Sequence, residues 1–230
     1  MTIEEMLTPY ESDTQNYLFV NSGLVKLRIE PKLYSEIVSG CYAAALRFLR
    51  CAEASSTFSK SIIDKGDAPP FPERAIQDQS LFDFFINGLS SIESFSYSLH
   101  GLAVALDTTG TLSMDEKRIR FITPITVQKM YSKLYPEEPI TKKVKGVIGS
   151  MTFLEWKRIR NIIIHRNMPP RRIYMFLGSV ESKPSELSIG LSLDSNTTVS
   201  RLSWLRESLN EMLSALAVFI ETRIELRENS

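Results

Sequence analysis

The sequence contains only two cysteines and two histidines among its 230 residues. Cys41 and Cys51 lie ten positions apart in a helical pattern, which separates them by about 15 Å, too far for a disulfide. We therefore expect two buried free thiols. His100 and His165 form no cluster with each other or with the cysteines at the spacing of a zinc site, so we predict neither a metal nor a cofactor.

Long apolar runs are also missing. The longest, such as residues 216–220, are far below the ~18 to 20 residues that a helix needs to cross a bilayer, and the first thirteen residues include four acidic side chains. We expect a soluble, cytoplasmic protein with no membrane partner. With 43% hydrophobic and 23% charged residues, and only 10 glycines and 11 prolines, the composition is that of a folded domain.

The charge is balanced overall but uneven along the chain. The 27 basic and 27 acidic residues cancel, which argues against a protein that coats nucleic acid non-specifically. Residues 141–172, however, carry nine basic residues and one acidic residue, Glu155, a net charge of +8. A solvated helix face followed by a basic loop explains this segment as well as a phosphate-bearing partner does.

Apolar residues recur at intervals of three and four over four long stretches, which predicts helices. The first follows Pro31 and runs to about residue 63, and the second spans residues 73–106. Gly88 and Gly101 interrupt the second, where we expect them to permit close helix packing. A third helix starts near Thr152, with Glu155 completing a capping box, and a final helix starts near residue 198.

The remaining segments favour short strands. Residues 1–31 read as an N-terminal extension with a hairpin about the turn-like 21–23, and residues 173–180 and 187–193 predict a second hairpin about a polar loop. The predicted fold is mainly α, an up-and-down helical bundle with one or two small β-hairpins. We assign residues 32–230 to one helical domain with a hairpin insertion near 172–194.

Several enzyme classes lack their motifs here. There is no Gly-x-Ser-x-Gly elbow, and the glycines at 146 and 149 fit neither a phosphate-binding loop nor a dinucleotide fingerprint. What stands out is Arg160 and His165 at the end of the third predicted helix. Imidazole transfers protons near neutral pH, and guanidinium donates to phosphate oxygens, so together they can act on a phosphodiester without metal.

The spacing of this pair is awkward for one ideal helix. Five residues correspond to about 140° of rotation and a 7.5 Å rise. We infer either that the helix frays at His165, before the prolines that follow, or that a second chain completes the pair across a two-fold axis.

The segment Arg160-Asn161-Ile162-Ile163-Ile164-His165 resembles the motif of the HEPN superfamily, helical-bundle proteins whose nuclease members carry an Arg, four to six intervening residues and a His. Asn161 matches the polar residue that usually follows the Arg. The two long preceding helices fit the family's layout, whereas the hairpins and residues 1–31 lie outside it. Arg158 also satisfies the spacing, so either arginine can be the motif residue, and Asn161 favours Arg160.

The resemblance implies a metal-independent endoribonuclease, such as a toxin or a phage-defence component, that works as a homodimer with an RNA substrate and an antitoxin or other protein partner. The RNA 2′-hydroxyl would attack the adjacent phosphate, with His165 handling the proton and Arg160 and Asn161 stabilising the charge. The basic residues around the motif, Lys157, Arg158 and Arg166, would contact the substrate. Glu93, on the second predicted helix, would have a supporting role near the Arg and the His.

Two other interpretations remain open. The first is a HEPN-like module without catalysis that binds nucleotide, RNA or a protein partner, and the second is a structural helical protein. For His165, the alternative to catalysis is a polar helix-end residue that interacts with the carbonyl dipole. For Glu93, the alternative to a supporting role is a place on the solvent-exposed face of a helix, together with Tyr97 and His100.

Overall fold

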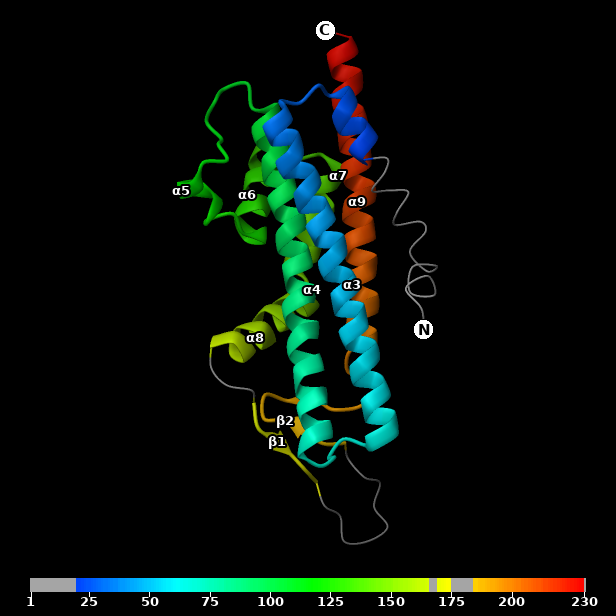
Figure 1. The fold of residues 1–230 in the computed structure, drawn as a ribbon. Coiled ribbons are helices and arrows are strands. Elements are labelled where there is room, and N and C mark those ends of the chain that lie inside the picture. The colour runs from blue at the N-terminus through cyan, green and yellow to red at the C-terminus, as the bar shows by residue number, and fades with distance from the viewer. Residues whose placement is uncertain (1–19, 166–168, 175–183, 230) are drawn as a thin grey trace. The chain divides into compact units, whose positions relative to one another are not determined.

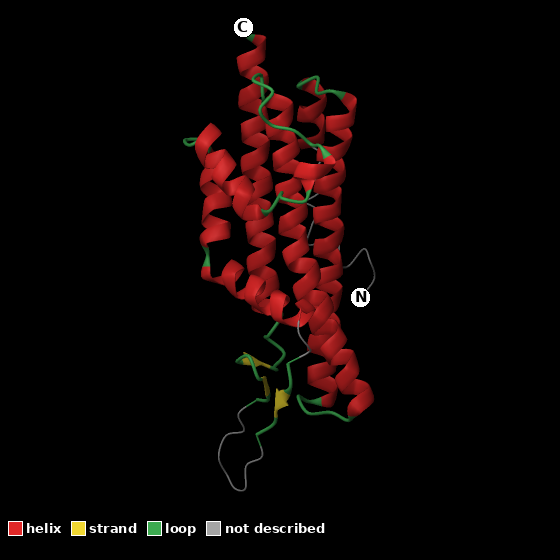
Figure 2. Cartoon of the chain, turned by 90° about the vertical axis from the view of Figure 1, so that its left-hand side faces the viewer, coloured by secondary structure: helices red, strands yellow, loops and turns green. Residues whose placement is uncertain are grey.

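The structure, a computed structural model, describes residues 20–165, 169–174 and 184–229. It is mainly helical with a small antiparallel sheet (Figures 1 and 2), as predicted. A short helix at residues 20–26 precedes the named elements, which are α3 (Pro31–Lys65), α4 (Phe71–Leu106), α5 (Glu116–Ile119), α6 (Pro124–Leu134), α7 (Pro139–Gly149), α8 (Met151–His165), β1 (Arg171–Arg172), β2 (Glu186–Leu187), β3 (Leu191–Ser192) and α9 (Val199–Glu228).

The long helices begin and end close to the predicted positions, because prolines and loops interrupt the apolar period there. The sheet has the order β1-β2-β3, with Arg171 opposite Leu187 and Leu187 opposite Leu191. Gly190 closes the β2–β3 turn at a φ of 81°, a left-handed conformation that suits glycine. A small sheet was predicted here, but its strands are placed differently: residues 173–174 are not in a strand, residues 175–180 lie outside the described residues, and residues 187–193 contain the turn between β2 and β3 instead of one strand.

The chain divides into two compact units. The first consists of Met1–Ala44, Ile92–Ser150 and Glu207–Ser230, and the second of Ala45–Ser91 and Met151–Arg206. Helices α3, α4 and α9 therefore contribute residues to both units. The assignment of residues 32–230 to one HEPN-like domain stays a prediction.

In the first unit, α3 packs closely on α4. A Cβ at Gly40 would lie 2.3 Å from the Ser98 hydroxyl oxygen, so only glycine allows this approach without rearrangement. Ser98 donates to the Ile37 carbonyl at 2.9 Å. Helix α6 joins the same core, because the buried Tyr131 hydroxyl donates to the Leu99 carbonyl at 2.8 Å.

In the second unit, α8 packs on α4 through Trp156. Its ring is fully buried and lies 4.8 Å from the Phe84 ring and 5.3 Å from the Phe85 ring, between centroids. A Cβ at Gly88 would lie 1.8 Å from the Trp156 ring. The expectation that Gly88 permits close packing is confirmed, and Gly101, whose Cβ would meet Ile37 at 3.0 Å, does the same in the first unit.

The N-terminal hairpin prediction is wrong over the described residues. Residues 20–26 are helical, and this helix with the turn that follows it places three apolar side chains, at intervals of four and three, in the core: Val20, Leu24 and Leu27. This helical spacing overrides the turn-like composition of residues 21–23, because burial of three large side chains outweighs a weak local preference. The helices that the structure describes include none long and apolar enough to span a bilayer.

Replacing Gly88 should destabilise the protein. The Cβ of Gly88→Ala would overlap the Trp156 ring, and overpacking of this kind costs about 1 to 3 kcal/mol. Gly146→Ala is the matched control, since a Cβ there meets nothing within 4 Å and alanine favours a helix by up to about 1 kcal/mol. Chemical denaturation should therefore give changes of opposite sign, and a neutral Gly88→Ala would contradict the packing described.

The two cysteines should be unreactive until the protein unfolds. Both are free and buried, as predicted. Burial raises the pKa of the Cys41 thiol to about 11 and that of Cys51 well above its usual value, so the nucleophilic thiolate is scarce at neutral pH. A colorimetric thiol reagent should detect neither thiol in the native protein and both in denaturant, whereas prompt native labelling would contradict this burial.

Candidate functional site

Helix α8 carries the predicted motif, and its inner face is buried. Four side chains at helical spacing hold it in the second unit: Phe153, Trp156, Ile159 and Ile163. Because each residue adds about 100° of rotation, the burial of this face fixes the direction of every other side chain on the helix.

The outer face of α8 brings together Arg158, Asn161 and His165, all exposed to solvent. They follow one another at intervals of three and four, which places them within about 60° on the helix surface. Two exposed apolar residues continue the same spacing toward the N-terminus of the helix, Met151 at 81% and Leu154 at 47% exposure. We call these five residues the α8 stripe.

Arg160 lies outside this stripe, toward the buried side of α8. It is half-buried, its Nε is buried, and it points about 140° away from His165 around the helix axis. Helix α8 continues to His165, its last residue, and because residues 166–168 lie outside the described part of the chain, the expectation that the helix frays at His165 stays a prediction. Within one chain, the arginine on the same face as His165 is Arg158, about 20° away but about 10.5 Å along the axis.

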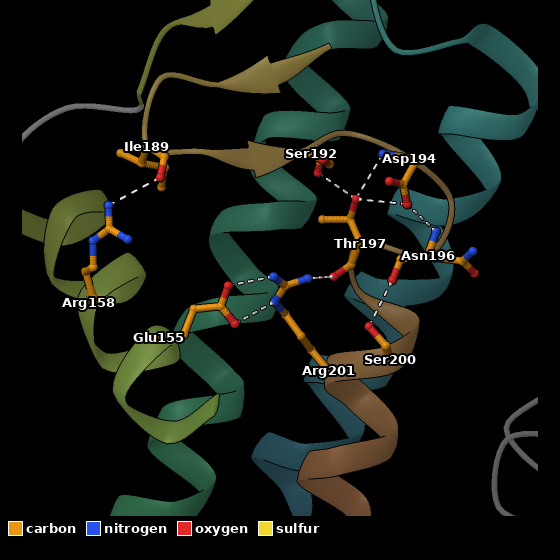
Figure 3. A network of polar contacts seen from close by, with 9 residues as sticks. All are labelled: Glu155, Arg158, Ile189, Ser192, Asp194, Asn196, Thr197, Ser200 and Arg201. Carbon is orange, nitrogen blue, oxygen red and sulfur yellow. Dashed lines mark hydrogen bonds and ion pairs between the residues drawn. The ribbon is translucent and has the colours of Figure 1, made fainter. Parts of the chain in front are cut away.

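An ion pair holds α8 on the N-terminal part of α9 (Figure 3). Glu155 accepts from Nη2 of Arg201 at 2.7 Å and from Nε at 3.3 Å, and the Arg201 Nη1 donates to the Thr197 carbonyl. The predicted capping box is wrong, because α8 begins at Met151 and Thr152 lies inside it. The Glu155 carboxylate is used for Arg201, a stronger charge-assisted partner than a backbone amide.

The loop before α9 is fixed by local hydrogen bonds. The Thr197 hydroxyl donates to the Ser192 carbonyl at 2.7 Å and accepts from the Asp194 amide at 2.9 Å, and the Asp194 carboxylate accepts from the Asn196 amide at 2.8 Å (Figure 3). One turn further along α8, Arg158 donates to the Ile189 carbonyl at 3.3 Å. The Arg158–Ile189 bond and the Glu155–Arg201 pair orient α8 against the sheet and α9.

Folding reduces the positive charge of the segment 141–172. Among the described residues, four of its nine basic side chains form ion pairs with acids from elsewhere in the chain: Lys142 with Glu137, Lys143 with Glu211, Arg171 with Asp78, and Arg172 with Glu186. Lys157 on α8 is half-buried. Among the described residues, the exposed cations of this segment that lie outside these ion pairs are Lys145 on α7 and Arg158 on α8.

Two predicted site residues are not brought to the stripe by what the structure describes. Arg166 lies outside the described residues. Glu93 belongs to the first unit and Arg160 to the second, so a supporting role for Glu93 stays a prediction. Among the described residues no group of three or more histidine, cysteine or acidic side chains is placed to hold a metal ion.

Sequence reasoning missed Arg201, which orients α8 although it lies 46 positions from Glu155. A charged pair this distant leaves no local periodicity or motif to find. Comparison of the chain with family models, curated proteins and solved structures gives no match. The function is therefore inferred from the α8 residues and their surroundings.

Removing the Glu155–Arg201 pair should loosen α8. Their side chains are 38% and 20% exposed, so Glu155→Ala leaves a partly buried guanidinium without its carboxylate and should cost about 1 kcal/mol after solvent screening. The control is Lys142→Ala, whose pair with Glu137 is far more exposed and should change stability by less than about 0.5 kcal/mol. Equal losses by denaturant titration would contradict this role.

Proposed function

We propose that the protein is a metal-independent endoribonuclease of the HEPN type, with its reactive groups on α8. The supporting observation is that α8 is fixed on its buried side while Asn161 and His165 of the motif, together with Arg158, share its exposed face. Groups held on a rigid helix need little reorganisation when substrate binds, which favours catalysis by electrostatic stabilisation.

The chemistry follows from residue type. The ribose 2′-hydroxyl attacks the adjacent phosphorus, the bond to the 5′-oxygen breaks, and a cyclic phosphate and a free 5′-hydroxyl remain. His165 transfers the proton during this step. An arginine and the Asn161 amide donate hydrogen bonds to the phosphate oxygens, where negative charge accumulates.

The arginine that acts with His165 depends on whether one chain or two form the site. In a single chain, Arg158 shares the exposed face with His165, whereas Arg160 points away and is half-buried. Arg160, which the motif favours, meets an imidazole only if that imidazole comes from a second copy. The proposed site is therefore a homodimeric one, in which the motifs of two copies face each other.

The apolar end of the α8 stripe supports a second copy as the partner. Met151 and Leu154 are large, apolar and exposed, and they extend the three-and-four spacing of the polar residues by about two turns. An alternation of this kind is the pattern by which one helix packs along another. The same contact would cover these side chains and bring two sets of Arg158, Asn161 and His165 into one cleft.

Cleavage of a mixed-sequence RNA in excess chelator tests the proposal. The wild-type protein should cut, and His165→Ala should cut about 10²- to 10⁴-fold more slowly, the range for loss of a general acid–base group. Arg160→Ala and Arg158→Ala should separate the two candidates, the motif arginine losing about 10²- to 10³-fold.

His100→Ala serves as the imidazole control, because His100 binds the Ser113 carbonyl in the first unit, and Lys60→Ala serves as the exposed cation control. Both should retain cleavage. A folded wild-type protein that binds RNA but does not cut it would instead favour the non-catalytic module. Undiminished cleavage by His165→Ala would contradict the proposed mechanism.

A further inference from the structure

A surface hollow lies in the second unit where the chain around β1 meets the first turns of α4, which Figure 1 shows side by side. Its volume is about 340 Å³, near the lower end of the range for small-molecule sites, and so suits a single nucleotide better than a larger ligand. Six residues line it: Arg74, Asp78, Pro169, Pro170, Arg171 and Ile173.

The floor of the hollow is a fixed ion pair. Arg171 is 5% exposed and donates to Asp78 Oδ1 from Nε at 3.1 Å and from Nη2 at 2.5 Å. Its Nη1 donates to the Gln77 side chain at 2.7 Å and to the Asp67 carbonyl at 3.0 Å. Four of the five donors of this guanidinium are thus used, so Arg171 shapes the hollow and is not itself a phosphate receptor.

The groups that remain for a ligand are of three kinds. Arg74 supplies a cation at the rim, 6.0 Å from the centroid of the Phe71 ring, which is itself 72% exposed. Asp78 is 30% exposed, and its Oδ2 accepts no hydrogen bond from the described residues. Pro170 and Ile173 add exposed apolar surface. An apolar wall, an acceptor and a cation match a base, its amino group and its phosphate.

The carboxylate distinguishes between bases. Adenine, cytosine and guanine each carry an exocyclic amino group that can donate to Asp78. Uracil has a single ring N–H between two carbonyl oxygens, and the negative charge of the carboxylate is repelled by these oxygens. The hollow therefore favours bases with an amino group.

The hollow also lies close to the proposed reactive group. His165 ends α8, and Pro169 lines the hollow four residues later. Because consecutive Cα atoms are 3.8 Å apart, the two Cα atoms are separated by no more than about 15 Å. A short stretch of one RNA strand can thus reach both.

We propose that this hollow binds an amino-bearing base of the RNA and so selects the sequence beside the cleavage point. The selection of a cleavage point rests on the proposed ribonuclease function, whereas the binding of a nucleotide does not. Arg74 holds the phosphate of that nucleotide, Asp78 accepts from its amino group, and Ile173 contacts its base.

Binding of 5′-mononucleotides to the full chain tests the hollow without any scissile bond. In calorimetric titrations, AMP, CMP and GMP should bind, UMP about tenfold more weakly, as expected for loss of one base contact, and inorganic phosphate more weakly still. Arg74→Ala should weaken nucleotide binding about tenfold. Lys60→Ala removes an exposed cation of α3 in the same unit and should leave binding unchanged.

Equal binding of all four nucleotides, or binding matched by inorganic phosphate, would show a phosphate site only and overturn the base selection. Titrations without binding would overturn the site itself. Cleavage assays on uridine-only and mixed RNA separate the hollow from the proposed ribonuclease function. Nucleotide binding without any cleavage would support the hollow and contradict the ribonuclease function. Cleavage that is unaffected by Arg74→Ala and by base composition would contradict base selection at the hollow and leave the ribonuclease function unaffected.

Discussion

The packing of Trp156 onto the bare backbone of Gly88 is the contact on which the site depends. A buried indole that fits only against glycine cannot turn or slide without a steric clash. Because the angular positions of helix residues are linked, the contact that directs Trp156 inward also directs Asn161 and His165 outward. The neighbouring rings of Phe84, Phe85 and Trp204 make the same position well packed on several sides.

Polar contacts add to this packing where it is weakest, at the edges of α8. The Glu155–Arg201 pair and the Arg158 contact with Ile189, one turn apart on α8, hold the helix against α9 and the β2–β3 turn. Such charge-assisted bonds are directional, whereas apolar burial is not. A helix held in both ways can present reactive groups in a fixed geometry, which is what a site acting by charge stabilisation needs.

The apolar period was enough to predict the long helices, the buried thiols and the role of Gly88, because each follows from residues near one another in sequence. It failed at residues 20–26, where turn-like residues form a helix. It also failed at Thr152, because α8 begins at Met151 and Glu155 pairs with the distant Arg201 instead of capping the helix. The charge of residues 141–172 was overstated, since acids such as Asp78 and Glu211 reach it only through folding.

The site shows the same division. The motif gave Asn161 and His165, whose shared exposed face the sequence spacing already implies. The half-burial of Arg160 follows from its place four residues after Trp156 and three before Ile163, on the buried side of α8. The hollow beside β1 was not predictable, because it depends on how distant segments pack against α4.

Mixing two inactive variants tests the composite site on α8 most directly. In the proposed two-copy site, His165→Ala removes the proton-transfer group and Arg160→Ala removes the motif arginine, so each variant alone should cut RNA far more slowly than the wild type. If Arg160 of one copy meets His165 of the other, the mixture should regain cleavage once subunits exchange, because one copy supplies the imidazole and the other the guanidinium. A mixture that stays as inactive as its components, although light scattering shows it to be dimeric, would contradict the two-copy site.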